Sequence, residues 1–169
     1  AHAHICFLCV GRGSSAFVSD LLADDPSLAG RIHSTSTLPA LQTARAIAAC
    51  DLMIQPFPDG ITTRRTSVMG CLINGRPVLT TAGALTESIW ARSGGVALAP
   101  AGDSRALLEL AGSLLADREA LAAVGVRGRV LYDDVFAMER TVTRLRSDVA
   151  AAAPPTASHR VFASGGLQV

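Results

Sequence analysis

The stretch His4-Ile5-Cys6-Phe7-Leu8-Cys9-Val10-Gly11-Arg12-Gly13-Ser14-Ser15-Ala16 decides the fold class. It begins as an apolar run of strand length, and its glycines permit a tight turn into a helix. Four more strand-like runs follow at 31–34, 51–55, 77–81 and 96–99, with helical patterns near 15–23, 40–49, 66–74 and 85–91. Strands that alternate with helices are typical of a parallel sheet covered on both faces. We therefore expect an α/β fold with a Rossmann-like, doubly wound parallel sheet.

Beyond Pro100 the pattern is helical only. Asp103 and Asp117 are placed to accept hydrogen bonds at helix N-termini, and Asp133 or Asp134 is expected to open a last helix that ends near Val149. The small residues and prolines that follow have neither helical nor strand periodicity. We expect one domain over 1–150 and a flexible tail over 151–169.

Composition excludes several classes of function. The 169 residues suit a single domain, and the 15 basic residues, all arginine, balance 14 acids to a net charge of +1. Bulk charge therefore supports no nucleic-acid partner and no membrane-surface role. No apolar run approaches the roughly 20 residues of a transmembrane segment, and no signal peptide is recognisable, so we expect a soluble cytoplasmic chain.

Cysteines 6 and 9 have the C-x-x-C spacing of metal and redox sites. Residues three apart on a strand point to opposite faces, so we expect them to be small core hydrophobes in a buried strand. Acidic pairs with a D-x-D spacing are also missing. We expect no metal and no other cofactor, so that arginines and backbone amides would carry any phosphate chemistry.

The first candidate site is the glycine loop after the first strand. Gly11 and Gly13 stand in a G-x-G-x-x-A pattern, which allows a backbone to approach phosphate at a helix N-terminus. A dinucleotide enzyme should also carry an acid about 20 residues later, and 31–36 contains none. The loop contacts a phosphate or sugar of some ligand, or it is a plain glycine turn.

The second candidate site is the run 55–67, which follows the third strand at the carboxyl edge of the sheet. Gly60 frees the backbone, and Thr66 or Ser67 can cap the next helix. Arg64 and Arg65 beside a helix N-terminus would make a cradle for a diphosphate. The alternative is that both arginines are solvated or paired with surface acids.

The third candidate follows the next strand, where Gly83 allows a close approach. Glu87 lies near a helix start and either contacts a ligand or only stabilises its own helix.

Several motifs in order resemble the C-terminal half of retaining, GT-B-fold glycosyltransferases of the group 1 class. The likeness covers about 5–147 and is carried by these segments: Cys50-Asp51-Leu52, Gly75-Arg76-Pro77-Val78-Leu79-Thr80-Thr81, Gly83-Ala84-Leu85-Thr86-Glu87, Ala97-Leu98-Ala99-Pro100-Ala101-Gly102-Asp103 and Leu115-Ala116-Asp117-Arg118-Glu119. The resemblance implies that this half binds a nucleotide-diphosphate sugar donor, and that a separate N-terminal domain, outside these 169 residues, binds the acceptor. We therefore expect the chain alone to have no transfer activity.

The resemblance also implies roles for residues. By position, Gly11 and Gly13 would face the donor phosphates or the sugar, and Ser36, Thr37 and Leu38 would line the base. In the longer loop, Asp59 and Gly60 would lie by the sugar, while Arg64, Arg65, Thr66 and Ser67 would hold the diphosphate. Glu87 would be a further donor contact. Asp59, Arg64 and Arg65 are the candidate catalytic residues, because guanidinium groups can stabilise the departing diphosphate.

One departure concerns the glutamate pair of the family. Its two acids are separated by seven residues, and ungapped alignment places Thr62 and Gly70 at those positions. The chain instead carries an Asp-Gly-x-x-x-Arg-Arg-x-Ser loop from Asp59 to Ser67. Two other functions stay open. One is an NAD(P)-dependent oxidoreductase that uses the Gly11 loop, for which Arg31 either contacts the ribose or only makes a surface contact. The other is a non-catalytic nucleotide-binding module.

Overall fold

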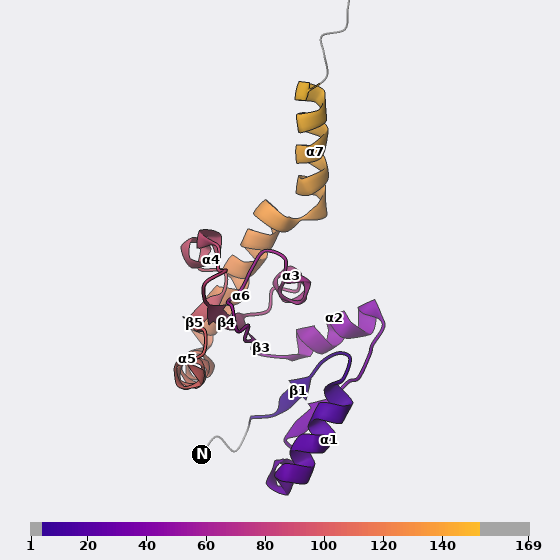
Figure 1. Cartoon of the computed structure of the whole chain (residues 1–169), viewed down its shortest axis with the longest axis vertical. Coiled ribbons are helices and arrows are strands. Elements are labelled where there is room, and N and C mark those ends of the chain that lie inside the picture. The colour runs from indigo at the N-terminus through magenta and orange to yellow at the C-terminus, as the bar shows by residue number, and fades with distance from the viewer. Residues whose placement is uncertain (1–4, 153–169) are drawn as a thin grey trace, which may run out of the picture. The chain divides into compact units, whose positions relative to one another are not determined.

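The computed structural model describes residues 5–152 (Figure 1). Its contacts divide the chain into two compact units, Ala1–Phe136 and Ala137–Val169. The elements of the first unit are β1 (Phe7–Cys9), α1 (Ser14–Asp24), a 3-10 turn (Pro26–Leu28), β2 (Ile32–Ser34), α2 (Ala40–Ala49), β3 (Met53–Gln55), α3 (Thr66–Ile73), β4 (Val78–Ala82), α4 (Ser88–Ser93), β5 (Ala97–Pro100), α5 (Ser104–Ala116), α6 (Arg118–Leu131) and a π-helical turn (Tyr132–Phe136). The second unit contributes α7 (Met138–Ala152).

The five strands all pair in parallel and alternate with helices, which confirms the α/β class. They form two sheets, one of order β1-β2 and one of order β3-β4-β5 (Figure 1). In the first, Leu8 is opposite His33; in the second, Leu79 pairs with Ile54 on one side and Ala97 on the other. The carboxyl ends of the strands within each sheet therefore lie at one edge.

The main core surrounds β4, the central strand of the larger sheet. Val78, Leu79 and Thr80 are fully buried, which explains why this strand is a continuous run and does not alternate. Helices α2, α3, α4 and α6 and the loop residue Ile61 also contribute to this core. The other fully buried side chains of the described residues are Ile61, Val68, Cys71, Leu72 and Trp90.

Helix α6 approaches the sheet through two glycines. A Cβ on Gly128 would lie 2.7 Å from the Gly95 carbonyl oxygen and 2.9 Å from a methyl of Leu72. A Cβ on Gly125 would lie 3.2 Å from Cδ of Pro77. The absence of side chains at these two positions lets the helix pack directly on backbone of the loops before β4 and β5.

Two helix starts were predicted correctly. Asp103 accepts from the Ala106 amide at 2.9 Å, and Asp117 accepts from the Ala120 amide at 2.9 Å, as N-cap residues of α5 and α6. The prediction for the last helix is wrong. Asp133 and Asp134 lie inside the π-helical turn, and Asp133 pairs with Arg129 at 2.8 Å in a continuation of α6, so α7 begins only at Met138.

The prediction of a buried first strand is also wrong. Only residues 7–9 form β1, Cys6 is exposed and Phe7 is 48% exposed, so Cys6 is no core hydrophobe. One edge of β1 pairs with β2, and the other edge has no partner strand among the described residues.

Helix α4 begins at Ser88, three residues later than expected, because the amide of Leu85 bonds to the Asp59 carbonyl at 3.0 Å and so belongs to a turn. The predicted tail over 151–169 lies, from residue 153 on, outside the described residues. Within 5–152, every helix is too short or too polar to cross a bilayer.

Candidate functional site

Two loops meet at the carboxyl ends of β3 and β4. The first, residues 56–65, connects β3 to α3, and the second, residues 83–87, connects β4 to α4. Gly60 has φ +88°, and a Cβ there would collide with the Gly83 amide and the Thr86 hydroxyl. A Cβ on Gly83 would in turn lie 2.7 Å from the Asp59 carbonyl carbon. The two glycines therefore let the backbones of the loops touch.

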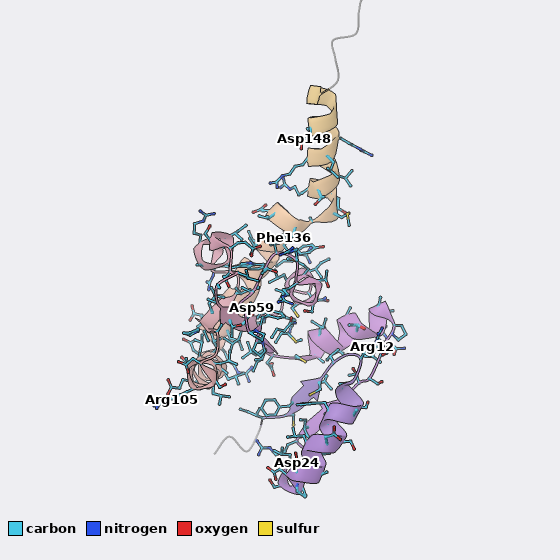
Figure 2. All side chains as sticks on the ribbon, in the orientation of Figure 1. Arg12, Asp24, Asp59, Arg105, Phe136 and Asp148 are labelled. Atoms are coloured by element: carbon cyan, nitrogen blue, oxygen red, sulfur yellow. The ribbon has the colours of Figure 1, made fainter. Side chains whose placement is uncertain are left out.

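The longer loop is anchored in the core. Ile61 is fully buried, and its amide donates to the Thr81 carbonyl at 2.8 Å. The Thr81 hydroxyl also joins the loop, since it accepts from the Phe57 amide at 2.8 Å and donates to the Phe57 carbonyl at 2.6 Å. These bonds fix both ends of the turn that carries Asp59, whose side chain is exposed (Figure 2). The position of the loop is therefore fixed by hydrogen bonds to Thr81 of β4.

Arg65 is held against the ring of Phe57. Its guanidinium carbon lies 4.4 Å from the ring centroid, a cation–π contact. Its Nε is buried and has no hydrogen-bond partner, an uncommon state for a guanidinium nitrogen. Arg64, the neighbouring residue, is exposed. One arginine of the predicted pair is therefore positioned by the protein and the other faces solvent.

The N-terminus of α3 lies beside these arginines. Arg65 itself is the N-cap residue, and no side chain accepts a hydrogen bond from the first turn. The expectation that Thr66 or Ser67 caps the helix is therefore wrong: both are inside its first turn, and the Ser67 hydroxyl donates to Gln55 at 2.8 Å. The uncapped first turn presents backbone amides and the positive end of the helix dipole.

Glu87 ties the two loops together. Its carboxylate accepts from the Thr63 amide at 3.1 Å, from the Thr63 hydroxyl at 2.9 Å and from the Trp90 indole at 3.0 Å. Partial desolvation acts to raise the pKa of Glu87, but these hydrogen bonds stabilise the ionised form and hold the pKa below its usual value. These hydrogen bonds connect the loop that carries Thr63 to the start of α4.

The glycine loop after β1 is a second cluster. Gly11 has φ +116° and Gly13 φ +82°, values that favour glycine, and nothing lies within 4 Å of a Cβ at either. The loop touches the end of β2: the Gly11 amide donates to the Thr35 hydroxyl at 3.3 Å. The Ser36 amide donates to the buried Ser14 hydroxyl at 3.1 Å, and Ser36 has φ +55°.

The structure thus brings the predicted residues together in two groups. Gly11, Gly13 and Ser36 gather at the ends of β1 and β2, with Thr37 exposed and Leu38 half-buried just beyond. The second group, at the ends of β3 and β4, consists of Asp59, Gly60, Arg64, Arg65, Thr66, Ser67 and Glu87. The strands of the two groups belong to different sheets.

Sequence reasoning missed three residues that shape these clusters. The ring of Phe57 packs against the guanidinium of Arg65, Thr63 donates hydrogen bonds to Glu87, and the Ser14 hydroxyl accepts from the Ser36 amide. Only Phe57 has a signal in the sequence, an aromatic residue placed between two prolines in a loop. Arg31, considered for a ribose, donates instead to the Ile5 carbonyl at 3.4 Å. No group of three or more metal-ligating side chains gathers anywhere in the described part of the chain.

Solved glycosyltransferase structures share this fold. HepE from Anabaena, in a complex with UDP-glucose, matches with a TM-score of 0.67 and 17% identity over 88% of this chain and 42% of its own. Sucrose-phosphate synthase from Thermosynechococcus elongatus matches with a TM-score of 0.67 and 18% identity, over 86% of this chain and 39% of its own. A glycosyltransferase from Rickettsia africae matches with a TM-score of 0.66 and 15% identity, over 90% of this chain and 42% of its own.

The chain thus spans about two fifths of the length of the structures it matches. It has the fold of one domain of GT-B group 1 glycosyltransferases, which confirms the fold that the sequence motifs indicated. No protein-family model and no curated protein matches the sequence.

Proposed function

We propose that this chain binds the diphosphate and sugar of a nucleotide-diphosphate sugar, as the donor-binding half of a glycosyltransferase. The observation that carries the proposal is the state of Arg65. Its guanidinium rests on Phe57, its Nε has no hydrogen-bond partner, and it stands at the uncapped start of α3. A cation and free helix-terminal amides in one place suit an anion such as a diphosphate.

The neighbouring residues extend this site. Arg64 is exposed next to Arg65 and supplies a second cation, and the amides of Thr66 and Ser67 supply donors at the helix start. Asp59 and Gly60 lie in the adjoining turn, where they would meet the sugar. Gly11 and Gly13 would approach the phosphates or the sugar, and Ser36, Thr37 and Leu38 would line the base.

Chemically, the proposal assigns electrostatic catalysis to the arginines. Breaking the bond between the sugar and the diphosphate leaves negative charge on the departing oxygen, and fixed guanidinium groups and amides stabilise that charge. No magnesium is needed for this role. Transfer with retention of the anomeric configuration would further require an acceptor-binding domain, so the chain alone should bind donor without transferring sugar.

The glutamate pair of the resembling family is replaced here by Thr62 and Gly70. Neither residue has a carboxylate for a ribose, and Thr62 is also buried. Glu87 is already committed to Thr63 and Trp90. We propose that ribose recognition in this chain depends on Asp59 or on the 36–38 segment.

Calorimetric titration of the chain with UDP, GDP, ADP, NAD and NADP tests the proposal. Arg65→Ala should weaken binding of the preferred nucleoside diphosphate at least tenfold, and Arg64→Ala should weaken it less. Arg105→Ala is the matched control, because Arg105 is exposed on α5 and pairs with Glu109 at 2.8 Å, away from the loops that carry Arg64 and Arg65 (Figure 2). Added EDTA should leave the affinity unchanged.

Three results would overturn the assignment. Binding of NAD or NADP alone would favour the oxidoreductase. Equal nucleotide affinities of the Arg64→Ala, Arg65→Ala and Arg105→Ala variants would show that Arg64 and Arg65 do not bind the diphosphate. Failure of every nucleotide to bind would reject nucleotide recognition by this chain altogether.

A further inference from the structure

Glu87 connects the buried core to the loop that carries the two candidate arginines. On the core side, its carboxylate accepts from the indole Nε1 of Trp90 at 3.0 Å, and Trp90 is fully buried and stacks on Phe136. On the loop side, both carboxylate oxygens lie 3.1 Å from the Thr63 amide nitrogen, and one accepts from the Thr63 hydroxyl at 2.9 Å. The carboxylate therefore fixes Thr63 relative to a side chain that the core holds in place.

Thr63 lies in the turn that leads into α3. The Arg65 amide donates to the Thr62 carbonyl at 3.1 Å, which closes a β-turn with Thr63 and Arg64 at its centre. Arg65 is the last residue of this turn and the N-cap of α3. The orientation of Thr63 therefore determines where the backbone of both arginines lies at the helix start.

Glu87 does not neutralise these arginines. No salt bridge joins it to Arg64 or Arg65, all three of which the structure describes. The hydrogen bonds that lower the pKa of Glu87 keep it ionised at neutral pH. A carboxylate beside this turn acts against a bound anion through its charge, because like charges repel. The charge of Glu87 and its hydrogen bonds thus have opposite expected effects on anion binding.

We propose that Glu87 is a positioning residue of the diphosphate site, which holds the Thr63 turn so that Arg64 and Arg65 meet the phosphates, and that it does not touch the donor. A site whose cations are already held in place loses less freedom when the anion binds, which strengthens binding. The resemblance to glycosyltransferases instead implied a donor contact for Glu87. The inference rests on the proposed nucleotide-diphosphate site, whose failure would be seen in the unmodified chain.

Glu87→Gln distinguishes these roles when inorganic pyrophosphate and the preferred nucleoside diphosphate are titrated in parallel by calorimetry. Glutamine has one acceptor oxygen and one NH2 donor, so either Thr63 or the Trp90 indole would face a donor. Positioning predicts that the Kd values of both ligands rise by the same factor, about fivefold or more. Loss of charge repulsion alone would lower both Kd values, and loss of a ribose contact would raise the Kd of the nucleoside diphosphate only.

Two further variants control for charge and for the hydrogen bond itself. Glu109→Gln removes the same charge from an exposed site on α5, where Glu109 pairs with Arg105, and should leave both Kd values unchanged. Thr63→Val removes the hydroxyl donor but keeps the amide and the shape of the side chain. It should raise both Kd values less than Glu87→Gln does, and should add little to that change in the double variant.

The buried Nε–H group of Arg65 gives a local readout of positioning. In NMR spectra of the unligated chain, we expect this group to exchange with water faster in Glu87→Gln than in wild type. The amide of Leu79, in the core strand β4, should exchange equally in both, which separates a displaced turn from a general loss of stability. Equal exchange of the Arg65 group would contradict the positioning role.

An equal or lower Kd for pyrophosphate in Glu87→Gln would overturn the inference and leave the nucleotide site in place. So would a wild-type chain that binds the nucleoside diphosphate but not pyrophosphate. Binding of neither ligand by the wild type would reject the proposed nucleotide site, and the inference with it. Should Glu87→Gln fail to fold, Thr63→Val compared with Glu109→Gln decides: an unchanged pyrophosphate Kd in Thr63→Val would then overturn the inference.

Discussion

Arg65 stacks its guanidinium group on the ring of Phe57, with 4.4 Å between the guanidinium carbon and the ring centroid. The contact places a cation at the start of α3 without a carboxylate partner, and the Nε of Arg65 is buried and unpaired. An arginine that is oriented by an aromatic ring keeps its positive charge available to an anion. An arginine in an ion pair would first have to break that pair.

Replacing Phe57 by leucine should therefore weaken nucleotide binding through Arg65. A cation–π contact contributes about 0.5–1 kcal/mol at exposed sites, so we expect the Kd for the preferred nucleoside diphosphate to rise about two- to fivefold. Calorimetric titration measures the change. Phe17→Leu is the matched control, because Phe17 is 57% exposed on α1 and far from this loop in sequence. Equal affinities in wild type and Phe57→Leu would show that the ring does not orient the cation.

Glu87→Gln should make the stability of the chain less dependent on pH. The pKa of Glu87 is held below its usual value, so its hydrogen bonds stabilise the fold fully above the unfolded pKa of about 4.3 and are lost as the pH falls through the lower folded pKa. Thermal melting from pH 7 to pH 3 should show a higher Tm for the wild type at pH 7 and a smaller difference at pH 3. A constant difference across this range would contradict a role for the ionised carboxylate.

Two glycine substitutions should have opposite effects on stability. Gly112 in α5 has no atom within 4 Å of a would-be Cβ, so Gly112→Ala should raise the free energy of unfolding by about 0.5–1 kcal/mol. Gly128→Ala in α6 places a methyl 2.7 Å from the Gly95 carbonyl oxygen, and should lower it by roughly 1–3 kcal/mol. Urea unfolding of both variants measures the two changes. Stabilisation by both would mean that α6 moves away from the sheet at little cost.

The thiols should differ in reactivity toward iodoacetamide at pH 8. Burial raises the pKa of Cys71 to about 12, and its side chain is inaccessible, so it should be alkylated only after unfolding. Cys6 is exposed and should be alkylated in the native chain. Mass spectrometry of digested protein, labelled with and without urea, distinguishes the sites. Rapid native labelling of Cys71 would indicate that the core around α3 opens readily.

The sequence predicted the elements of the fold better than their assembly. Each apolar run overlaps a strand, and Asp103 and Asp117 cap helices as expected, because these signals are local. The separation into two sheets could not be predicted, since pairing depends on which strand edges meet. Asp133 resembled a cap residue, but its pairing with Arg129 one turn earlier keeps it inside a helical segment.

In the candidate site, too, local features could be predicted from the sequence and contacts between distant residues could not. Glycines and paired arginines after a strand are visible in the sequence, and the structure places Gly60, Arg65 and the start of α3 together. The bond between Thr63 and Glu87 spans 24 residues and follows only from the packing of two loops. The stacking of Phe57 under Arg65 depends on a turn whose shape is fixed by Ile61 in the core. Such contacts have no sequence spacing by which to find them.

Trp90, the one tryptophan of the chain, is fully buried. It donates to Glu87 and stacks on Phe136 with 5.5 Å between ring centroids, whereas the β1–β2 part carries no indole. Its fluorescence is therefore a built-in optical probe of the larger sheet and its loops. Unfolding confined to the β1–β2 part would be silent in this signal, and comparison with circular dichroism would separate the melting of the two halves without any label.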